Sequence, residues 1–165
     1  MSQLLESLGT VEIPAIPQFV VLDHFVVNTS RREGAGVKIS SLGPSFQEWF
    51  LGKIEEPITG SVLRYAKLLK LSSSGLIIAE LGGAKKVAMT LGGVHDLMAL
   101  QPNCEEGTLL TANDCANVLY AYDVMDVLRA VRVGQGDGGW SVGAYSVLPP
   151  YGWDKGCQVF STLSP

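Results

Sequence analysis

The chain has 165 residues, with 12 basic and 16 acidic side chains and a net charge of −4 at pH 7. Its apolar fraction of 47% and charged fraction of 17% predict one folded domain with a hydrophobic core, and they argue against a disordered chain. No segment gathers the lysines and arginines that neutralise phosphates, so we expect no nucleic-acid partner.

The N-terminal sequence and the cysteines bear on location and metal binding. The N-terminus lacks the basic segment and apolar run of a secretory leader, and no apolar run approaches the ~20 residues of a membrane-spanning helix. We therefore expect a cytoplasmic protein with no membrane partner. Cys104, Cys115 and Cys157 are odd in number and stand at no zinc-binding spacing, so we predict reduced thiols and no metal site.

The N-terminal half is predicted to alternate short strands and helices within a single domain, residues 1–165. Residues 1–17 are expected to form an N-terminal arm or short helix, with an amphipathic helical turn over 2–8. The run 18–30 is apolar on both alternating faces, which is typical of a strand buried on both sides. Residues 37–42 are predicted to form the return strand.

Pro44 is expected to begin the first helix, because proline suits the first turn. Four apolar side chains recur at helical spacing after it and predict the central stripe of the core: Phe46, Trp49, Phe50 and Ile54. Pro57 is expected to end this helix. Residues 61–81 predict a β-hairpin around 72–75, with a helix over 62–70 as the alternative.

A second helix, which carries His95, is predicted from the N-cap Thr90 to Gln101, and residues 103–114 are predicted as a loop. From Ala116 onward, short strands alternate with tight turns, which predicts an antiparallel meander followed by one more short strand. The expected fold class is α+β. A mostly antiparallel sheet of about six to eight strands, including this C-terminal meander, is packed on one face by two α-helices.

A glycine run matches the G-x-G-x-x-G fingerprint of dinucleotide-binding loops at Gly134, Gly136 and Gly139. In such a site the glycines lead into a helix, whose first amides hold the pyrophosphate. Here residues alternate with a period of two from Trp140 onward, which indicates a strand. We therefore predict a hairpin turn and no cofactor.

One cysteine is a candidate nucleophile. Cys115 paired with His24 or His95 would make a small Cys–His hydrolase or transferase, because a histidine base activates the thiol. Such cysteines commonly lie at a helix N-terminus, whereas Cys115 precedes a predicted strand. The G-x-S-x-G and H-E-x-x-H motifs are absent from the sequence, so we favour a protein without catalytic residues.

Aromatic residues gather in the C-terminal segment. They are the candidate ligand- or partner-binding residues: Trp140, Tyr145, Tyr151 and Trp153. Aromatic rings beside prolines and glycines are typical of ligand grooves and protein interfaces. The alternative is that Trp140 belongs to the core while Tyr151 and Trp153 cover a sheet edge.

We predict a non-catalytic binding or interaction module whose partner is an unknown protein or a small molecule. The Cys–His enzyme centred on Cys115 is the first alternative. A homo-oligomeric structural protein is the second, because a free sheet edge can pair with another copy of the chain.

Several segments resemble short uncharacterised proteins of uncultured bacteria: "FQEWFLGKIEE", "ANVLYAYDVMDVLRAVRV", "GGWSVGAYSV" and "WDKGCQVFS". The resemblance extends over most of the chain from Val20 on. It implies a small intracellular bacterial protein, and it implies no activity, cofactor, partner or site residue.

Overall fold

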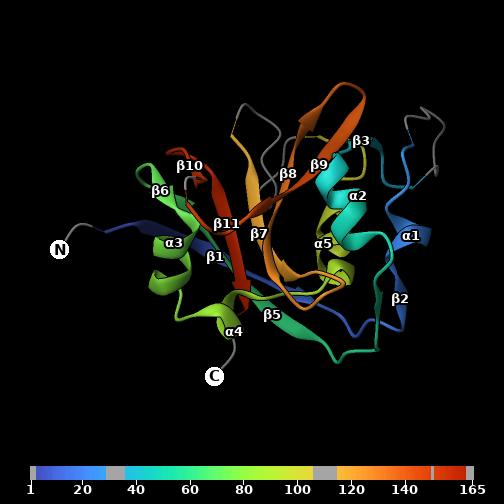
Figure 1. Cartoon of the computed structure of the whole chain (residues 1–165), viewed down its shortest axis with the longest axis horizontal. Coiled ribbons are helices and arrows are strands. Elements are labelled where there is room, and N and C mark those ends of the chain that lie inside the picture. The colour runs from blue at the N-terminus through green and yellow to red at the C-terminus, as the bar shows by residue number, and fades with distance from the viewer. Residues whose placement is uncertain (1–2, 29–35, 106–114, 150, 163–165) are drawn as a thin grey trace.

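A sheet of short strands runs through the centre of the molecule (Figure 1). The computed structural model describes residues 3–28, 36–105, 115–149 and 151–162, and within them the sheet has seven strands in the order β1-β5-β11-β7-β8-β9-β3. These strands are β1 (Leu5–Ile13), β3 (Ile39–Leu42), β5 (Ser61–Leu68), β7 (Asn117–Tyr122), β8 (Leu128–Gly136), β9 (Gly139–Ser146) and β11 (Gln158–Thr162). Neighbouring strands are antiparallel except for β11 with β7 and β3 with β9, which are parallel. The prediction of a mostly antiparallel α+β sheet is confirmed.

The β7-β8-β9 meander follows the predicted succession of short strands and tight turns. In β7, Leu119 and Ala121 belong to one hydrophobic core, while Val118 and Tyr120 belong to the other, and all four are fully buried. We call the side of Leu119 the first face of the sheet and the side of Val118 the second face. Because successive strand residues point to opposite faces, a strand that is apolar throughout needs cover on both.

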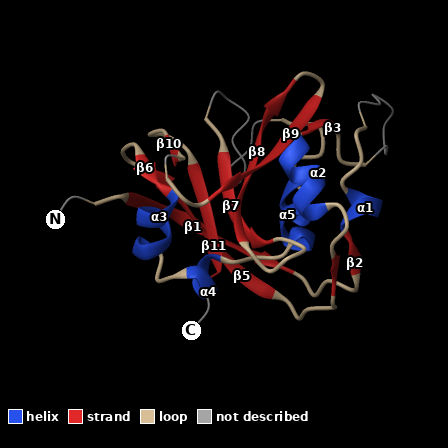
Figure 2. Cartoon of the chain, viewed as in Figure 1, coloured by secondary structure: helices blue, strands red, loops and turns tan. Residues whose placement is uncertain are grey.

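Helices supply that cover on both sides (Figure 2). The first face packs against α1 (Val21–His24), α2 (Pro44–Phe50) and α5 (Leu91–Ala99), whereas the second face packs against α3 (Ser74–Glu80) and α4 (Ala84–Val87). The prediction that two helices pack on one face is therefore wrong. The central strands are apolar on both sides, so neither face can be left to water.

Two short strand pairs flank the main sheet, β2 (Phe19–Val20) with β4 (Ile54–Glu55) and β6 (Ser72–Ser73) with β10 (Gly152–Trp153). The α5 helix begins as predicted, because the side chain of Thr90 accepts a hydrogen bond from the N–H of Gly93 at 3.0 Å. The β10 strand matters for the candidate site, since it carries Trp153.

The N-terminal segment differs from the prediction. A helical turn is expected over 2–8, but residues 5–13 form an edge strand whose backbone pairs with β5. The predicted strand over 18–30 is also wrong, since β2 is two residues long and α1 follows at once. Pairing with strands far along the chain determines the conformation of both segments, and the local periodicity of the sequence carries no information about that pairing.

The first predicted helix is shorter than expected. Its Phe46 and Phe50 are fully buried in the first core, whereas Trp49 is half-buried at the margin of that core. Ile54 has left the helix for β4, where it is 58% exposed. Of the hairpin predicted around 72–75, the first arm is β5, which also contradicts the alternative helix over 62–70. The second arm is the helix α3, with Ser73 as its N-cap.

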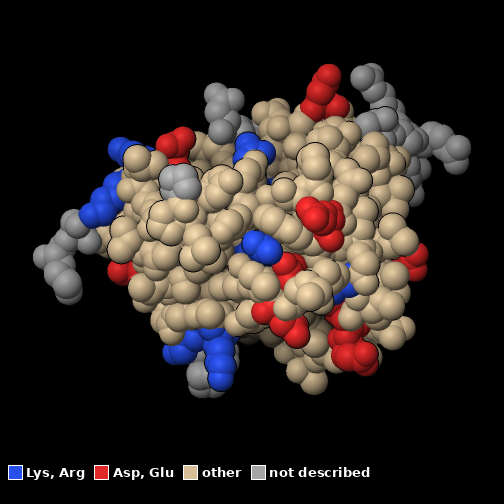
Figure 3. All heavy atoms as spheres, in the orientation of Figure 1, with Lys and Arg blue, Asp and Glu red and all other residues tan. Residues whose placement is uncertain are grey.

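Charged side chains of both signs lie in separate small groups on the face of the molecule shown in Figure 3. Among the described residues, no helix combines the length and the hydropathy that crossing a membrane requires. The predicted loop 103–114 falls mostly outside the described residues, because 106–114 are not among them.

Candidate functional site

A pocket of ≈ 520 Å³ opens on the second face of the sheet. Small-molecule sites commonly measure roughly 300–1,000 Å³. Its lining comes from the two residues just before β7, from β8 and β9, and from the segment around β10: Cys115, Ala116, Arg132, Tyr145, Tyr151, Gly152, Trp153, Asp154, Lys155 and Cys157. Residues far apart in the sequence therefore meet here because β8 and β9 pair and β10 folds back over them.

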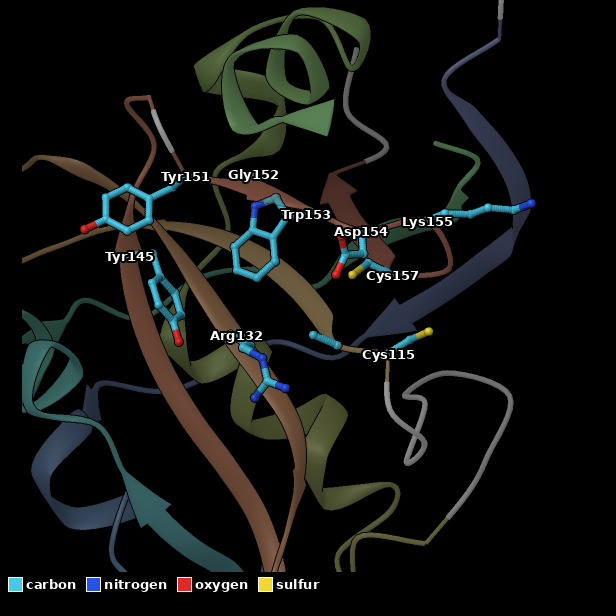
Figure 4. A pocket seen from close by; sticks show the side chains of 10 residues that line it. Cys115, Arg132, Tyr145, Tyr151, Gly152, Trp153, Asp154, Lys155 and Cys157 are labelled. Carbon is cyan, nitrogen blue, oxygen red and sulfur yellow. The ribbon is translucent and has the colours of Figure 1, made fainter. Parts of the chain in front are cut away.

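Three aromatic rings form one wall of this pocket (Figure 4). The ring of Tyr145 lies 6.1 Å from that of Tyr151 and 5.7 Å from that of Trp153, centroid to centroid. Tyr145 is 36% exposed and Tyr151 is 49% exposed, whereas Trp153 is only 8% exposed. The two tyrosines thus present ring surface to solvent, and Trp153 is the buried base of the wall.

Trp153 is held from behind by a buried hydroxyl. Its Nε1–H donates to Ser74 Oγ at 3.0 Å, and the hydroxyl of Tyr120 donates to the same atom at 3.1 Å. Burial raises the pKa of Tyr120 to about 12, so the phenol stays protonated at neutral pH. The indole ring is therefore fixed to α3 and to β7 at once, which limits its rotation.

β10 approaches β6 closely, and a glycine makes this approach feasible. Gly152 pairs with Ser73, and a Cβ atom on Gly152 would lie 3.1 Å from the carbonyl oxygen of Ser72. A side chain at 152 would push β10 outward and carry Trp153 away from the sheet.

Arg132 is the cation on the floor of the pocket. Alternation along β8 places its side chain on the second face, where it is half-buried. A Cβ atom on Gly134 would lie 2.6 Å from Arg132 Nη1 and 2.9 Å from its Cζ, so the guanidinium rests on the bare backbone of Gly134. Across the hairpin, the ring of Tyr145 lies over Gly143 in the same way, with 3.6 Å between its Cε2 and a Cβ atom placed there. The two glycines, which lack side chains, thus allow the Arg132 guanidinium and the Tyr145 ring to lie directly against the backbone of the sheet.

The glycine fingerprint lies within the β8–β9 hairpin, as predicted. Gly134 and Gly136 belong to β8 and Gly139 to β9, and of the turn glycines Gly138 has the positive φ of 93°. A Cβ atom on Gly139 would lie 2.8 Å from the backbone of Lys38, so this glycine lets the chain before β3 come close.

Trp140 does not belong to the pocket. It is fully buried in the first core, on the opposite face of the sheet, and its Nε1–H donates to the backbone oxygen of Gln101 at 2.8 Å. The core alternative was the better interpretation of Trp140. Of the four aromatic candidates, the structure brings Tyr145, Tyr151 and Trp153 together.

Cys115 and the two histidines lie on opposite faces of the sheet. Cys115 lines the pocket on the second face, where no histidine is among the lining residues. His24 and His95 lie over the first core, with ring centroids 5.3 Å apart, and the ring of Phe19 stacks on His24 at 4.3 Å. The structure therefore does not support a Cys–His pair, because neither histidine is placed to act as the general base for Cys115.

The ionisation of the neighbouring groups follows from their surroundings. Burial raises the pKa of the Cys157 thiol, so it stays protonated at neutral pH.

On the opposite face of the sheet, burial and then the nearby charge of His24 lower the pKa of His95 to about 4. Within the described parts of the chain, no three His, Cys, Asp or Glu side chains are grouped so that they could hold a metal ion.

Comparison with known proteins adds no relative: no family model, no curated protein and no solved structure matches the chain.

Proposed function

We propose that the protein is a non-catalytic binding module that holds a small organic molecule with a planar ring in this pocket. The observation that carries the proposal is the convergence of three aromatic rings on one pocket of ≈ 520 Å³. Exposed tyrosine rings beside a fixed tryptophan offer apolar area for stacking, and they lose little conformational entropy when a ligand binds.

Titration with the neutral amide 2-naphthamide tests this proposal. We expect saturable binding with a Kd of about 1 mM or below, as expected at about 0.3 kcal/mol per non-hydrogen atom for such a ligand. The ¹H–¹⁵N NMR shifts should change at the residues that line the pocket. Shift changes spread over the whole surface, or no saturation, would contradict the proposal.

A pair of variants connects that binding to the aromatic wall. Tyr151→Ala removes an exposed ring, so we expect Kd to rise about fivefold with the thermal midpoint unchanged. Leu148→Ala is the matched control, because Leu148 lies in the same connection and is 67% exposed but does not line the pocket. Equal changes in Kd for the two variants would show that the aromatic wall does not bind the ligand.

A further inference from the structure

A half-buried cation, Arg132, lies beside the aromatic wall. Within the parts of the chain that the structure describes, Arg132 makes no hydrogen bond and no ion pair. Arg129 offers a direct comparison on the same strand. Its Nε lies 2.9 Å from Asp123 Oδ2, and its guanidinium lies 3.8 Å from the ring centroid of Trp49. An arginine that is partly removed from water without a partner favours an anion from outside the chain.

The position of this cation is set by the backbone beneath it. The three heavy atoms nearest to a Cβ atom on Gly134 all belong to the Arg132 guanidinium, at 2.6, 2.9 and 3.0 Å. Any side chain at 134 would displace the guanidinium. Because no side chain at 134 lifts the guanidinium away from the sheet, its hydrogen-bond donors lie at the floor of the pocket, beside the Tyr145 ring that lies over Gly143.

The other charged groups of the pocket favour a ligand with one negative charge. Asp154 also lines the pocket and would repel a second charge. Lys155 contributes little to the floor, because its side chain extends away from the aromatic rings and from Arg132 (Figure 4). One guanidinium therefore faces one anionic group, and its planar fork matches a carboxylate.

We propose that the ligand is an aromatic carboxylate whose ring packs against Tyr145, Tyr151 and Trp153 and whose carboxylate binds Arg132. This inference rests on the proposed function of the same pocket, and it adds the chemical class of the ligand and the residue that selects it. The glycine at 134 is a positioning residue, because it acts through Arg132.

The test compares 2-naphthoate with its neutral counterpart 2-naphthamide by calorimetry at low ionic strength. We expect 2-naphthoate to bind about tenfold more tightly to the wild-type protein, as charge-assisted hydrogen bonds do. Arg132→Gln should abolish this preference, because the Kd of 2-naphthoate should rise much more than the Kd of 2-naphthamide. Lys155→Gln is the matched control, since it removes a cation of the pocket rim and should keep the preference.

Gly134→Ala provides a second, independent variant if Arg132→Gln does not fold. It keeps every charged group and places its methyl group only against the movable end of a side chain, so the fold should be retained. We expect it to reduce the preference for 2-naphthoate, because the Kd of 2-naphthoate should rise more than the Kd of 2-naphthamide. An unchanged preference for 2-naphthoate over 2-naphthamide would show that Gly134 does not position Arg132 for the carboxylate.

The outcomes separate the two proposals. If 2-naphthamide binds but 2-naphthoate binds no more tightly, the carboxylate assignment is wrong and the aromatic pocket stands. If 2-naphthyl phosphate binds more tightly than 2-naphthoate, the anion is a phosphate and the assignment is again overturned. If none of the three compounds binds, both proposals fail.

Discussion

The carboxylate of Glu55 caps the first turn of α5. Its Oε2 accepts a hydrogen bond from the N–H of Leu91 at 2.8 Å, and its Oε1 accepts one from Gly92 at 2.9 Å. The β2–β4 pair brings this side chain to the helix, and Lys53 Nζ lies 3.2 Å from Oε2. Glu55 is only 8% exposed, so these donors replace the water that the carboxylate gives up.

Glu55→Ala should therefore lower the free energy of unfolding by about 1–3 kcal/mol, because two amides at the start of α5 lose their acceptor. Urea unfolding followed by circular dichroism measures the change. Glu56→Ala is the control, since Glu56 is exposed. Equal midpoints for the two variants would show that the cap does not stabilise the fold.

The two aromatic side chains at the end of α2 should differ in their importance. Phe50 is fully buried, so Phe50→Ala should cost about 3–5 kcal/mol. Trp49→Ala should cost about 1–2 kcal/mol, because its ring is half-buried and Arg129 covers one side of it. Helical spacing alone places both side chains in the same buried stripe and predicts large costs for both, and a urea titration of the two variants distinguishes this expectation from the structural one.

The hydroxyl of Ser74 accepts hydrogen bonds from both Trp153 and Tyr120, so its removal should destabilise the core. Ser74→Ala leaves two buried donors without an acceptor, and we expect a loss of about 1–3 kcal/mol in the free energy of unfolding. Adding Tyr120→Phe removes one of those donors, so the double variant should cost less than the sum of the two single variants. Additive losses in thermal unfolding would rule out a shared hydrogen-bond network.

Trp153→Ala should likewise destabilise the protein. The indole is 8% exposed and belongs to the second core. Tyr151 is consequently the better position for separating ligand binding from folding.

The stability of the protein should depend on pH through His95. Its pKa is about 4 in the folded protein instead of 6.5, so between these values the unfolded chain binds more protons than the folded one. The free energy of unfolding is then at its full value above pH ~6.5, and it falls by up to about 3 kcal/mol as the pH drops towards 4.

Urea midpoints measured at several pH values, for the wild type and for His95→Leu, check this dependence. The variant should lose most of the decline. Asp96 acts in the opposite direction, because burial raises its pKa, so the comparison of the two proteins isolates the histidine. Parallel pH profiles would assign the decline to other groups.

The homo-oligomeric alternative requires a free sheet edge, and β1 is at one end of the strand order. Glu6 and Glu12 are exposed along this strand, and such charges disfavour pairing with a second copy. We expect a monomer in sedimentation equilibrium at high protein concentration. A dimer that Thr10→Pro abolishes would support the alternative instead.

The sequence predicted those elements whose pattern is local. Short apolar or alternating runs separated by tight turns are sufficient for β7, β8 and β9, and the N-cap Thr90 is sufficient for the start of α5. β1 and α1 depend on partners far along the chain. The glycines of α5 are a further example: by propensity Gly92 weakens the helix, yet a Cβ atom there would lie 3.1 Å from Ile16 Cγ2.

Part of the candidate site was within reach of the sequence. Tyr145, Tyr151 and Trp153 are close together in the chain, and they could be grouped without a structure. Strand parity places Trp140 and Tyr145 on opposite faces, which is the signal that could have removed Trp140. Arg132 was missed, because its meeting with Tyr145 depends on the register of β8 and β9.

The place of β11 has a consequence for how the protein is made. This strand comes last in the sequence among those of the main sheet, yet it lies between β5 and β7, antiparallel to one and parallel to the other. Its Val159 and Phe160 are buried on opposite faces. During synthesis the β1–β5 pair and the β7–β8–β9 meander therefore each have one edge whose backbone groups lack their partner strand, and the sheet can be completed only after residues 158–162 have left the ribosome.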